Sequence, residues 1–456
     1  MSAKENKSSF IDKLSTWSQK YVPDALPLVF FLTFVVAIMA MILTGSNPIQ
    51  IAHYWYDGFW SLLTFTINIV MLMFTGFLVA NSKPVARLLA NIAKKPNSTR
   101  SAVLIYMIVT IVLFYIHFAL GMAAAIVFGK ALIVEQNKKG NKLPIGLIAA
   151  AAGFCIVFQA GPTASAPLTV STPGHFMEDV IGLVTMERTM FTWPIILMNV
   201  VMAVIFLVLF PRMAENDKTE DSADAEILAR FEKEVEDAQR ETKVNANTFA
   251  EKMDNFAVFQ LILGVVGFVL VIISIVQGGL SKLGFSSVNM FFFTLAMILT
   301  KTPSELGRVA KQSIGAVTGV VLQFPFYAGI FGILNYSGLG QVLTEFFVSI
   351  SSGRMFTTIV LWFSALLNML VPSGGSQFVV EAPYILPAGL QLGVDAGKIV
   401  SAFTCGDLLT NLIQPFWAIP VLSAYGVKFR KIFPYCFVAF LIAFVVVSGT
   451  FLFFMY

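Results

Sequence analysis

Two polar, helix-breaking passages lie in the otherwise apolar stretch 368–420: LVPSGGSQ at residues 370–377 and DLLTNLIQP at residues 407–415. An unpaired backbone group is costly in lipid, so such breaks persist only where protein or a water-filled cavity surrounds them. Alternatively, these passages are only kinks in packed helices, and a single glycine or proline would favour that interpretation. Two dense polar breaks so close together instead indicate a binding site near the middle of a membrane-spanning region.

The composition predicts a protein that crosses a membrane several times. Of the 456 residues, 57% are hydrophobic and 12% are charged, and the mean hydropathy is +0.80. Soluble proteins carry roughly 25% charged residues. The net charge of +4 is too small to indicate a nucleic-acid partner. The expected surroundings are therefore the lipid bilayer.

The chain lacks the motifs that would indicate the commonest membrane enzymes. HExxH, CxxC and GxxxxGK[ST] do not occur in it, which disfavours a metalloprotease and ATP hydrolysis by a P-loop. The three cysteines are Cys155, Cys405 and Cys436, and all lie in apolar runs, which indicates no disulfide framework. We expect no enzymatic activity, no metal and no organic cofactor. A membrane-embedded enzyme and a passive channel remain as alternatives from other classes.

Apolar length predicts an all-α, polytopic fold in two halves. After a polar segment at 1–22, the first half (23–211) has candidate spans at 25–43, 60–80, 102–134, 143–170 and 191–210. A charged linker follows at 212–253 with a candidate helix at 223–240, interpreted as a solvated connector in preference to a regulatory domain. The second half (254–456) has candidate spans at 256–276, 288–300, 314–334, 356–390, 400–422 and 434–456.

The two halves repeat at a fixed offset, which is typical of internal duplication. Gly121 and Gly374 are 253 residues apart, and the repeat cores are expected at about 58–211 and 311–456. Each core contains an apolar block that is broken into a hairpin, and then a span that is broken at a Pro-x₄-Pro pair. The same offset relates Gly76 to Gly329, Gly140 to Gly393, Gly153 to Gly406, Pro162 to Pro415 and Pro167 to Pro420.

The basic residues orient the two copies oppositely, because Lys and Arg mark the cytoplasmic side of a membrane protein. Basic clusters at 83–100 and 138–142 flank the first hairpin block, whereas charge is sparse around the second. After the broken span, copy one is acidic at 178–188 and copy two is basic at 428–431. We predict inverted-topology repeats, each with a re-entrant helical hairpin and a broken transmembrane helix. This is an alternating-access transporter design, with the N-terminus and linker in the cytoplasm and the C-terminus outside.

The second polar passage is the candidate site for a coupling cation. Asp407, Asn411 and Gln414 are spaced to share one helical face, and Thr410 adds a hydroxyl beside them. A carboxylate in a span is costly to bury, so it is a functional candidate by default. We expect these four residues to bind a cation or carry a proton. The structural alternative is a hydrogen bond to a neighbouring helix.

The first polar passage and its counterpart are the candidate substrate site. A turn with backbone amides, hydroxyls and helix ends can hold a carboxylate group. Copy one has polar groups at its own break, expected across a cavity from Asp407. No arginine lies in this region, which favours a small monocarboxylate over a dicarboxylate. The candidates are Ser373, Gly374, Gly375, Ser376, Gln377, Gln159, Thr163, Ser165 and Gly121.

Three ionisable residues lie within the hairpin arms. Glu381 and Lys130 could pair or could each reach a membrane boundary. His117 precedes Gly121, so we expect it near a hairpin tip, where it could titrate near neutral pH. A satisfied packing residue is the alternative for His117. Glu381 and His117 are thus candidate titrating groups.

Several longer motifs resemble the bacterial short-chain fatty acid transporter family, the acetoacetate and butyrate uptake family of the ion transporter superfamily. The likeness runs from about Val22 to the C-terminus and is weakest in the charged linker. The motifs that carry it are VPSGG at 371–375, QPFWAIP at 414–420, QFPFYAGI at 323–330, SGLG at 337–340 and DGFW at 57–60.

The resemblance implies a secondary active carrier of short-chain carboxylates in the bacterial inner membrane, with a periplasmic C-terminus under the orientation above. It also implies the superfamily's inverted repeats and is compatible with a homodimer. We expect transport coupled to H⁺ or Na⁺. Carriage of another organic anion, such as a dicarboxylate or an aromatic-acid conjugate, is the nearest alternative.

Overall fold

The computed structural model describes residues 25–216, 223–240 and 247–456, and these are helical with no strand among them. Eight of the described helices are long and apolar enough to cross a membrane. The all-helical, polytopic fold is thus confirmed. The predicted N-terminal segment at 1–22 lies outside the described residues.

In the first half the helices are α2 (Ala25–Thr44), α3 (Pro48–Phe59), α4 (Leu63–Ala80), α5 (Lys83–Ala93), α6 (Thr99–Ile116), α7 (Phe118–Lys138), α8 (Ile145–Phe154), η1 (Cys155–Gln159), α9 (Ser165–Val170), α10 (Glu178–Ile181), η2 (Met186–Arg188) and α11 (Trp193–Asn216).

The second half follows two helices of the linker region. Its long helices agree with the predicted spans to within a few residues at most ends. The linker helices are α12 (Ala225–Gln239) and α13 (Phe249–Asp254), and the second half contains α14 (Ala257–Gly278), η3 (Gly279–Lys282), α15 (Phe285–Thr300), α16 (Pro303–Ser313), η4 (Ile314–Val317), α17 (Thr318–Tyr336), α18 (Leu339–Ile350), α19 (Phe356–Leu367), α20 (Gly374–Gln391), α21 (Ala396–Asn411), α22 (Pro415–Tyr425) and α23 (Phe429–Phe454).

Both predicted hairpins are present as pairs of helices. The first, α6–α7, turns at His117, whose backbone is extended (φ −160°, ψ 116°). The sequence pattern placed this turn at Gly121. The turn in the structure lies four residues earlier. Gly121 instead sits where the arms approach each other, because a Cβ there would lie 2.7 Å from the Phe114 backbone. The second hairpin, α19–α20, turns within residues 368–373.

Both predicted helix breaks are also present. In the first half, η1 ends at Gln159 and α9 begins at Ser165, so the chain is non-helical around Gly161 and Pro162. Pro167 lies inside the first turn of α9, where a missing N–H costs little. In the second half, α21 ends at Asn411 and α22 begins at Pro415. Each break thus coincides with the first proline of a Pro-x₄-Pro pair.

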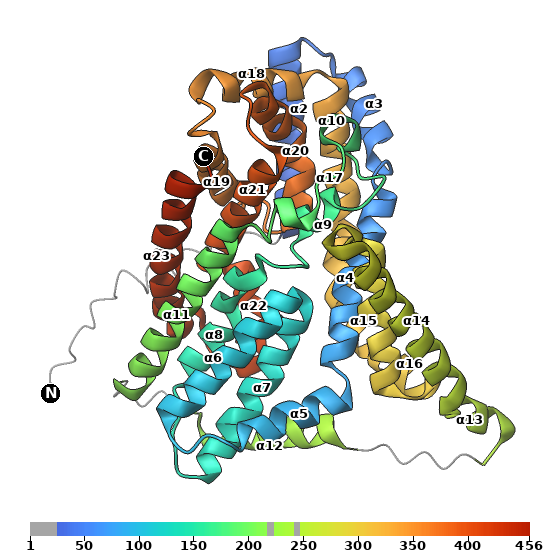
Figure 1. The fold of residues 1–456 in the computed structure, drawn as a ribbon, viewed down its shortest axis with the longest axis vertical. Helices are drawn as coiled ribbons and strands as arrows, with labels where there is room; N and C mark the ends of the chain where they lie inside the picture. The colour runs from blue at the N-terminus through green and yellow to red at the C-terminus, as the bar shows by residue number, and fades with distance from the viewer. Residues whose placement is uncertain (1–24, 217–222, 241–246) are drawn as a thin grey trace, which may run out of the picture.

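The two halves place corresponding elements in the same order. Helix α4 is followed by α5, the α6–α7 hairpin, the broken α8–α9 helix and α11, and helix α17 is followed by α18, the α19–α20 hairpin, the broken α21–α22 helix and α23. Figure 1 shows α6 and α7 toward one end of the molecule, and α18 and α20 toward the other. The broken helices meet between them, since α21 contacts η1 and α9.

The predicted linker helix exists as α12, but it packs onto the transmembrane part and so is not a freely solvated connector. Phe231 is fully buried and its ring meets Tyr425 edge-to-face at 5.8 Å. Glu234 pairs with Lys130 of α7 at 2.5 Å, and Arg87 of α5 donates to the Gln239 carbonyl. Figure 1 shows α12 beside α5 at the lower end of the molecule.

Candidate functional site

A cavity of about 170 Å³ lies where the second hairpin tip meets the two helix breaks. Helices α4, α7 and α17 supply most of its apolar wall, and α21, η1, α9 and the hairpin tip supply its polar groups together with Gln323 of α17. This volume is below the roughly 300–1,000 Å³ of drug-sized sites, so it suits a ligand of a few heavy atoms. The lining residues are Ile69, Met73, Phe118, Gln159, Ser165, Ala316, Gly319, Val320, Gln323, Phe324, Pro372, Ser373, Gly374, Gly375, Asp407 and Asn411.

The Asp407 carboxylate lies against the N-terminus of α20. Gly374 is the first residue of that helix, and a Cβ built on it would come 2.6 Å from Asp407 Oδ2. Only a glycine leaves room for the carboxylate in this position. A helix N-terminus carries a partial positive charge and free N–H groups, so it stabilises an anion there. The hairpin tip and Asp407 therefore form one electrostatic unit.

Asn368 ties the start of the hairpin tip to the end of α21. Its buried amide nitrogen lies 2.7 Å from the Asp407 carbonyl, 2.9 Å from Thr410 Oγ1 and 2.8 Å from Asn411 Oδ1. The Thr410 hydroxyl in turn donates to the Ala365 carbonyl at 2.8 Å. Gln414 joins the same network, since its amide donates to Asn411 Oδ1 at 2.6 Å. Side-chain hydrogen bonds thus join the break to the hairpin tip, in addition to the backbone bonds from the Ile413 and Gln414 amides to the Thr410 carbonyl.

Four acceptor oxygens at this hairpin and break are buried without a hydrogen-bond partner in the described part of the chain. They are Asp407 Oδ1, Asn368 Oδ1, Gln377 Oε1 and Gln414 Oε1. An unsatisfied buried acceptor is costly and calls for an explanation. Oxygens of this kind are the ligands that hard cations prefer, and they also accept hydrogen bonds from a protonated group.

The first half contributes the opposite side of the cavity. Gln159 and Ser165 flank its break, and both line the cavity together with Asp407, as the sequence predicts. The Asn199 amide donates to the Ala160 carbonyl at 2.9 Å and so supports the non-helical backbone. A Cβ on Gly161 would lie 2.4 Å from the Tyr115 carbonyl, so the break packs tightly on the first hairpin.

The cavity collects about half of the residues that the sequence singled out. Those that line it are Ser373, Gly374, Gly375, Gln159, Ser165, Asp407 and Asn411. Thr410, Gln414 and Ser376 lie immediately behind, in hydrogen bonds within the tip and the break. The structure does not place Thr163, Gln377, Gly121, His117 or Glu381 in this lining.

Glu381 and Lys130 do not pair, because each has another partner. Lys130 forms its ion pair with Glu234, as described above. The Glu381 carboxylate is fully buried and accepts from the Ser364 hydroxyl at 2.6 Å and from the Gln377 amide at 2.5 Å. Gln377 also donates to the Ser364 carbonyl at 2.7 Å. Glu381 and Gln377 therefore brace the two arms of the second hairpin behind its tip.

His117 lies at the tip of the first hairpin, as predicted. It is fully buried, its Nδ1 accepts from the Leu120 amide at 3.4 Å, and its ring meets Phe292 edge-to-face at 4.3 Å. A Cβ on Gly76 would lie 2.4 Å from the His117 ring, so α4 also packs closely on it. These contacts fit a packing role, but the buried Nε2 of His117 has no hydrogen-bond partner among the described residues, so the histidine is not fully satisfied. Phe118 beside it lines the cavity.

Sequence reasoning missed the contributions of α4 and α17 to the site. Gln323 and Phe324 line the cavity from α17, and Ile69 and Met73 line it from α4. Gln323 carried a signal, because it is a polar residue inside an apolar span and stands two positions before Pro325. Ile69 and Met73 carried none, since apolar residues in a span look alike whichever way they point.

The fold and the site together define a multi-span membrane transporter. The structure aligns with the Alcanivorax borkumensis YdaH transporter, described as having an unusual topology, at a TM-score of 0.55 over 94% of this chain and 98% of that one, with 14% identity. It also aligns with Neisseria gonorrhoeae MtrF, described among antimetabolite efflux pumps, at a TM-score of 0.53 over 98% and 97% of the two chains, with 13% identity. At these identities the likeness concerns the fold.

The chain belongs to the short chain fatty acid transporter family, whose model matches residues 8–454. Two curated relatives carry the name "Putative short-chain fatty acid transporter". The one from Escherichia coli (strain K12) is 30% identical over 94% of this chain and 95% of its own length. The one from Haemophilus influenzae is 29% identical over 93% and 95%. The resemblance seen in the sequence motifs is therefore confirmed at the level of this family.

Proposed function

We propose that this protein is a cation-coupled secondary active carrier of small monocarboxylates such as acetoacetate and butyrate. The observation that carries the proposal is a carboxylate, Asp407, in a small cavity whose described lining contains no Lys, Arg or His. Two carboxylates about 4 Å apart repel by about 4 kcal/mol at an effective dielectric constant near 20. A carboxylate substrate therefore enters favourably only when a proton or a metal cation neutralises Asp407.

The oxygen atoms around the tip fit the coupling role. The unpartnered acceptors of Asp407, Asn368 and Gln414 offer oxygen ligands to Na⁺, and Asp407 alone offers a proton site. We therefore assign the coupling cation to Asp407, Asn411 and Gln414, and we add Asn368 to this group. Thr410 supports the group through its hydrogen bonds to Asn368 and to the Ala365 carbonyl.

The remaining walls fit a short acyl chain with one polar end. Phe118, Val320 and Phe324 present apolar surface, and Gln159 and Ser165 present hydrogen-bonding groups. The backbone at Gly374 and Gly375 opens an 18-residue helix, whose N-terminus favours an anionic group once Asp407 is neutralised. The small volume of the cavity speaks against an aromatic-acid conjugate as the substrate.

Alternating access would follow if the two halves have opposite orientations in the membrane. In support, corresponding hairpins lie toward opposite ends of the molecule and the broken helices meet at the site (Figure 1). The same relation puts the N-terminus and α12 in the cytoplasm and Tyr456 in the periplasm of a bacterial inner membrane. Reporter fusions after Tyr456 test this orientation, and cytoplasmic activity of the fusion would contradict it. Cross-linking in the native membrane tests whether two copies associate.

The decisive experiment is uptake of labelled butyrate and acetoacetate into proteoliposomes with a proton gradient or a sodium gradient imposed separately. The wild type is expected to accumulate substrate under one of the two gradients. Asp407→Asn is expected to lose gradient-driven accumulation while the protein remains monodisperse, because a neutral amide needs no cation to admit an anion. Residual exchange of substrate without a gradient would agree with this account.

Other outcomes redirect or reject the proposal. Accumulation that survives Asp407→Asn would refute the assigned cation site. Accumulation of succinate in place of butyrate would establish a different organic anion as the substrate. The absence of any solute accumulation would reject the carrier mechanism.

A further inference from the structure

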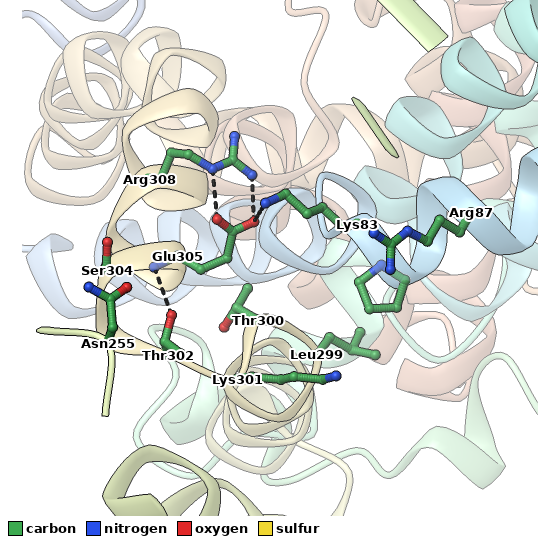
Figure 2. Close-up of a pocket in the computed structure, with 11 residues that line it drawn as sticks. Lys83, Arg87, Asn255, Leu299, Thr300, Lys301, Thr302, Ser304, Glu305 and Arg308 are labelled. Atoms are coloured by element: carbon green, nitrogen blue, oxygen red, sulfur yellow. Dashed lines mark hydrogen bonds and ion pairs between the residues drawn. The ribbon is translucent and has the colours of Figure 1, made fainter. Parts of the chain in front are cut away.

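A second, larger cavity lies away from the transport site, at the end of the molecule where α5 meets α16. It measures about 390 Å³, and it lies between α5, the α15–α16 connection, the start of α16 and the residue that joins α13 to α14 (Figure 2). It shares no lining residue with the transport cavity. Its lining consists of Lys83, Pro84, Arg87, Asn255, Leu299, Thr300, Lys301, Thr302, Ser304, Glu305 and Arg308.

Positive charge dominates this cavity. Four basic side chains line it and Glu305 is its one carboxylate, so three positive charges are in excess. Glu305 accepts from Arg308 at 2.7 and 2.9 Å and pairs with Lys83 at 3.1 Å, as Figure 2 shows. Lys83 and Glu305 are each only 16% exposed, so these charges are partly shielded from water. Arg87 is held in place by the Gln239 carbonyl of α12.

Lys301 is held in the cavity wall by a strained turn. Its φ of 65° is the one positive value among the described non-glycine residues. With ψ at −41° and a 2.8 Å bond from the Thr302 amide to the Thr300 carbonyl, it forms a γ-turn of the rare positive-φ kind. A lysine is poorly suited to this backbone and a glycine would adopt it freely. Strain of this kind concentrates at functional sites, where the side chain is needed in spite of it.

We propose that this cavity binds a phosphate-bearing anion. Lysine and arginine side chains are the usual partners of phosphate oxygens. Thr302 and Ser304 add hydroxyl groups to the same lining and Asn255 adds an amide, whereas the Thr300 hydroxyl already donates to the Ala296 carbonyl. A monocarboxylate would leave most of these donors unused, and the cavity has more than twice the volume of the transport site. The ligand is therefore distinct from the transported substrate, and the inference does not depend on the proposed transport chemistry.

Two sources can supply the phosphate group, the headgroup of an anionic phospholipid or a soluble phosphate ester. The surroundings favour the lipid. Asn255 lies two residues before α14, and at the start of this helix Phe256, Phe259 and Leu263 are 41%, 61% and 64% exposed. Acyl chains can lie along this apolar face while the headgroup occupies the basic cavity. Basic pockets between membrane helices bind anionic headgroups in this way.

The site also joins the two halves of the chain. Lys83 and Arg87 belong to α5 of the first half, whereas Lys301, Glu305 and Arg308 belong to the second. A bound phosphate would add contacts to the Lys83–Glu305 ion pair that already links them. We expect the ligand to strengthen this link between α5 and α16.

The test measures binding to the purified, delipidated full-length protein in a non-ionic detergent. Phosphatidylglycerol, phosphatidylcholine, glycerol 3-phosphate and inorganic phosphate are titrated separately, with native mass spectrometry and thermal melting as readouts. The wild type is expected to bind phosphatidylglycerol and to melt at a higher temperature with it. Lys301→Gln and Lys83→Gln are each expected to weaken binding roughly fivefold, the usual contribution of one basic residue near a membrane surface. Lys142→Gln is the matched control, an exposed lysine outside the cavity, and should leave binding unchanged.

Lys301→Gly separates a binding role from a structural one. It removes the charge and relieves the turn, so the unliganded protein should melt at a higher temperature while its affinity falls about fivefold. If Lys301 had a role in packing alone, the melting temperature and the affinity would change in the same direction. Competition by glycerol 3-phosphate or inorganic phosphate would identify a soluble ligand, and binding of phosphatidylglycerol alone would identify a lipid. Equal affinity of the wild type, Lys301→Gln and Lys83→Gln for every probe would overturn the proposal.

Discussion

The two hairpin-and-break units have the same order of helices but different chemistry. In the second unit, the tip and the break carry Asp407, Asn368 and Gln414, each with a buried oxygen that has no partner among the described residues. In the first unit, the tip is His117 packed against Phe292, and the break packs against the Tyr115 carbonyl. His117 Nε2 and the Thr163 hydroxyl are also buried there without a partner among the described residues, but neither belongs to a carboxylate. The first unit adds only neutral groups to the cavity, Gln159 and Ser165 among them.

This difference indicates that the two halves have different roles. A charged group in a membrane needs compensation, which is easier to arrange once than twice. The first unit can therefore specialise in shape, where close packing of apolar groups fixes the wall of the cavity. The second unit carries the Asp407 carboxylate and most of the unpartnered buried oxygens among the described residues of the two units. Substitutions at matching positions in the two units should then affect different quantities, transport in one and stability in the other.

The largest expected effect is that of Gly374→Ala in the second unit. Its Cβ would come 2.6 Å from Asp407 Oδ2, so the carboxylate must move. Displacement of a preorganised group by about 1 Å can cost on the order of a hundredfold in rate. We expect a loss of about that size in gradient-driven uptake, with little change in melting temperature, because alanine favours a helix.

Gly153→Ala is the matched control for that substitution. Gly153 also lies in a helix next to a break, but a Cβ there meets no atom within 4 Å. Uptake should therefore remain within twofold of the wild type. Equal losses in the two variants would contradict a special role for the contact between Gly374 and Asp407.

Gly121→Ala in the first unit should act on stability instead. Gly121 lies 253 residues before Gly374, the offset of the predicted repeat, but its Cβ would lie 2.7 Å from backbone atoms of Phe114, which cannot move cheaply. Overpacking of this kind costs about 1–3 kcal/mol. We expect a lower melting temperature and less folded protein, with the uptake of each folded molecule nearly unchanged. A loss of uptake at unchanged stability would show that the first tip also belongs to the transport machinery.

The sequence predicted the helical framework well because span length and helix breakers are local signals. The two hairpins and the two breaks appear where apolar runs and prolines indicated, although the first turn lies four residues before Gly121. Helix α12 appears in the charged segment that was predicted to be helical. It did not predict the amphipathic helices α3, α5, α16 and α18, because spans were read from apolar length alone. The packing of α12 was missed as well, since the burial of Phe231 depends on a partner, Tyr425, nearly 200 residues away.

The site was predicted in part, for a similar reason. Asp407 and the SGG turn stood out because polar groups and paired glycines are rare in apolar spans. Gln377 and Glu381 stood out equally, but the structure turns them toward Ser364 behind the tip. Which side of a hairpin arm faces the cavity is decided by tertiary packing. A single sequence does not reveal it when both sides are surrounded by apolar residues.

The smallest expected effect concerns Gln159, the neutral group that the first unit presents to the cavity. Loss of one neutral hydrogen bond costs about 0.5–1.5 kcal/mol, so Gln159→Ala should raise the KM for butyrate by roughly twofold to tenfold. Coupling should survive, because Asp407 is untouched. Thr163→Ala is the control, since Thr163 is buried at the same break but does not line the cavity. An increase in KM for Thr163→Ala but not for Gln159→Ala would contradict this prediction. The substrate would then contact the Thr163 side of the break, in a conformation that differs from this one.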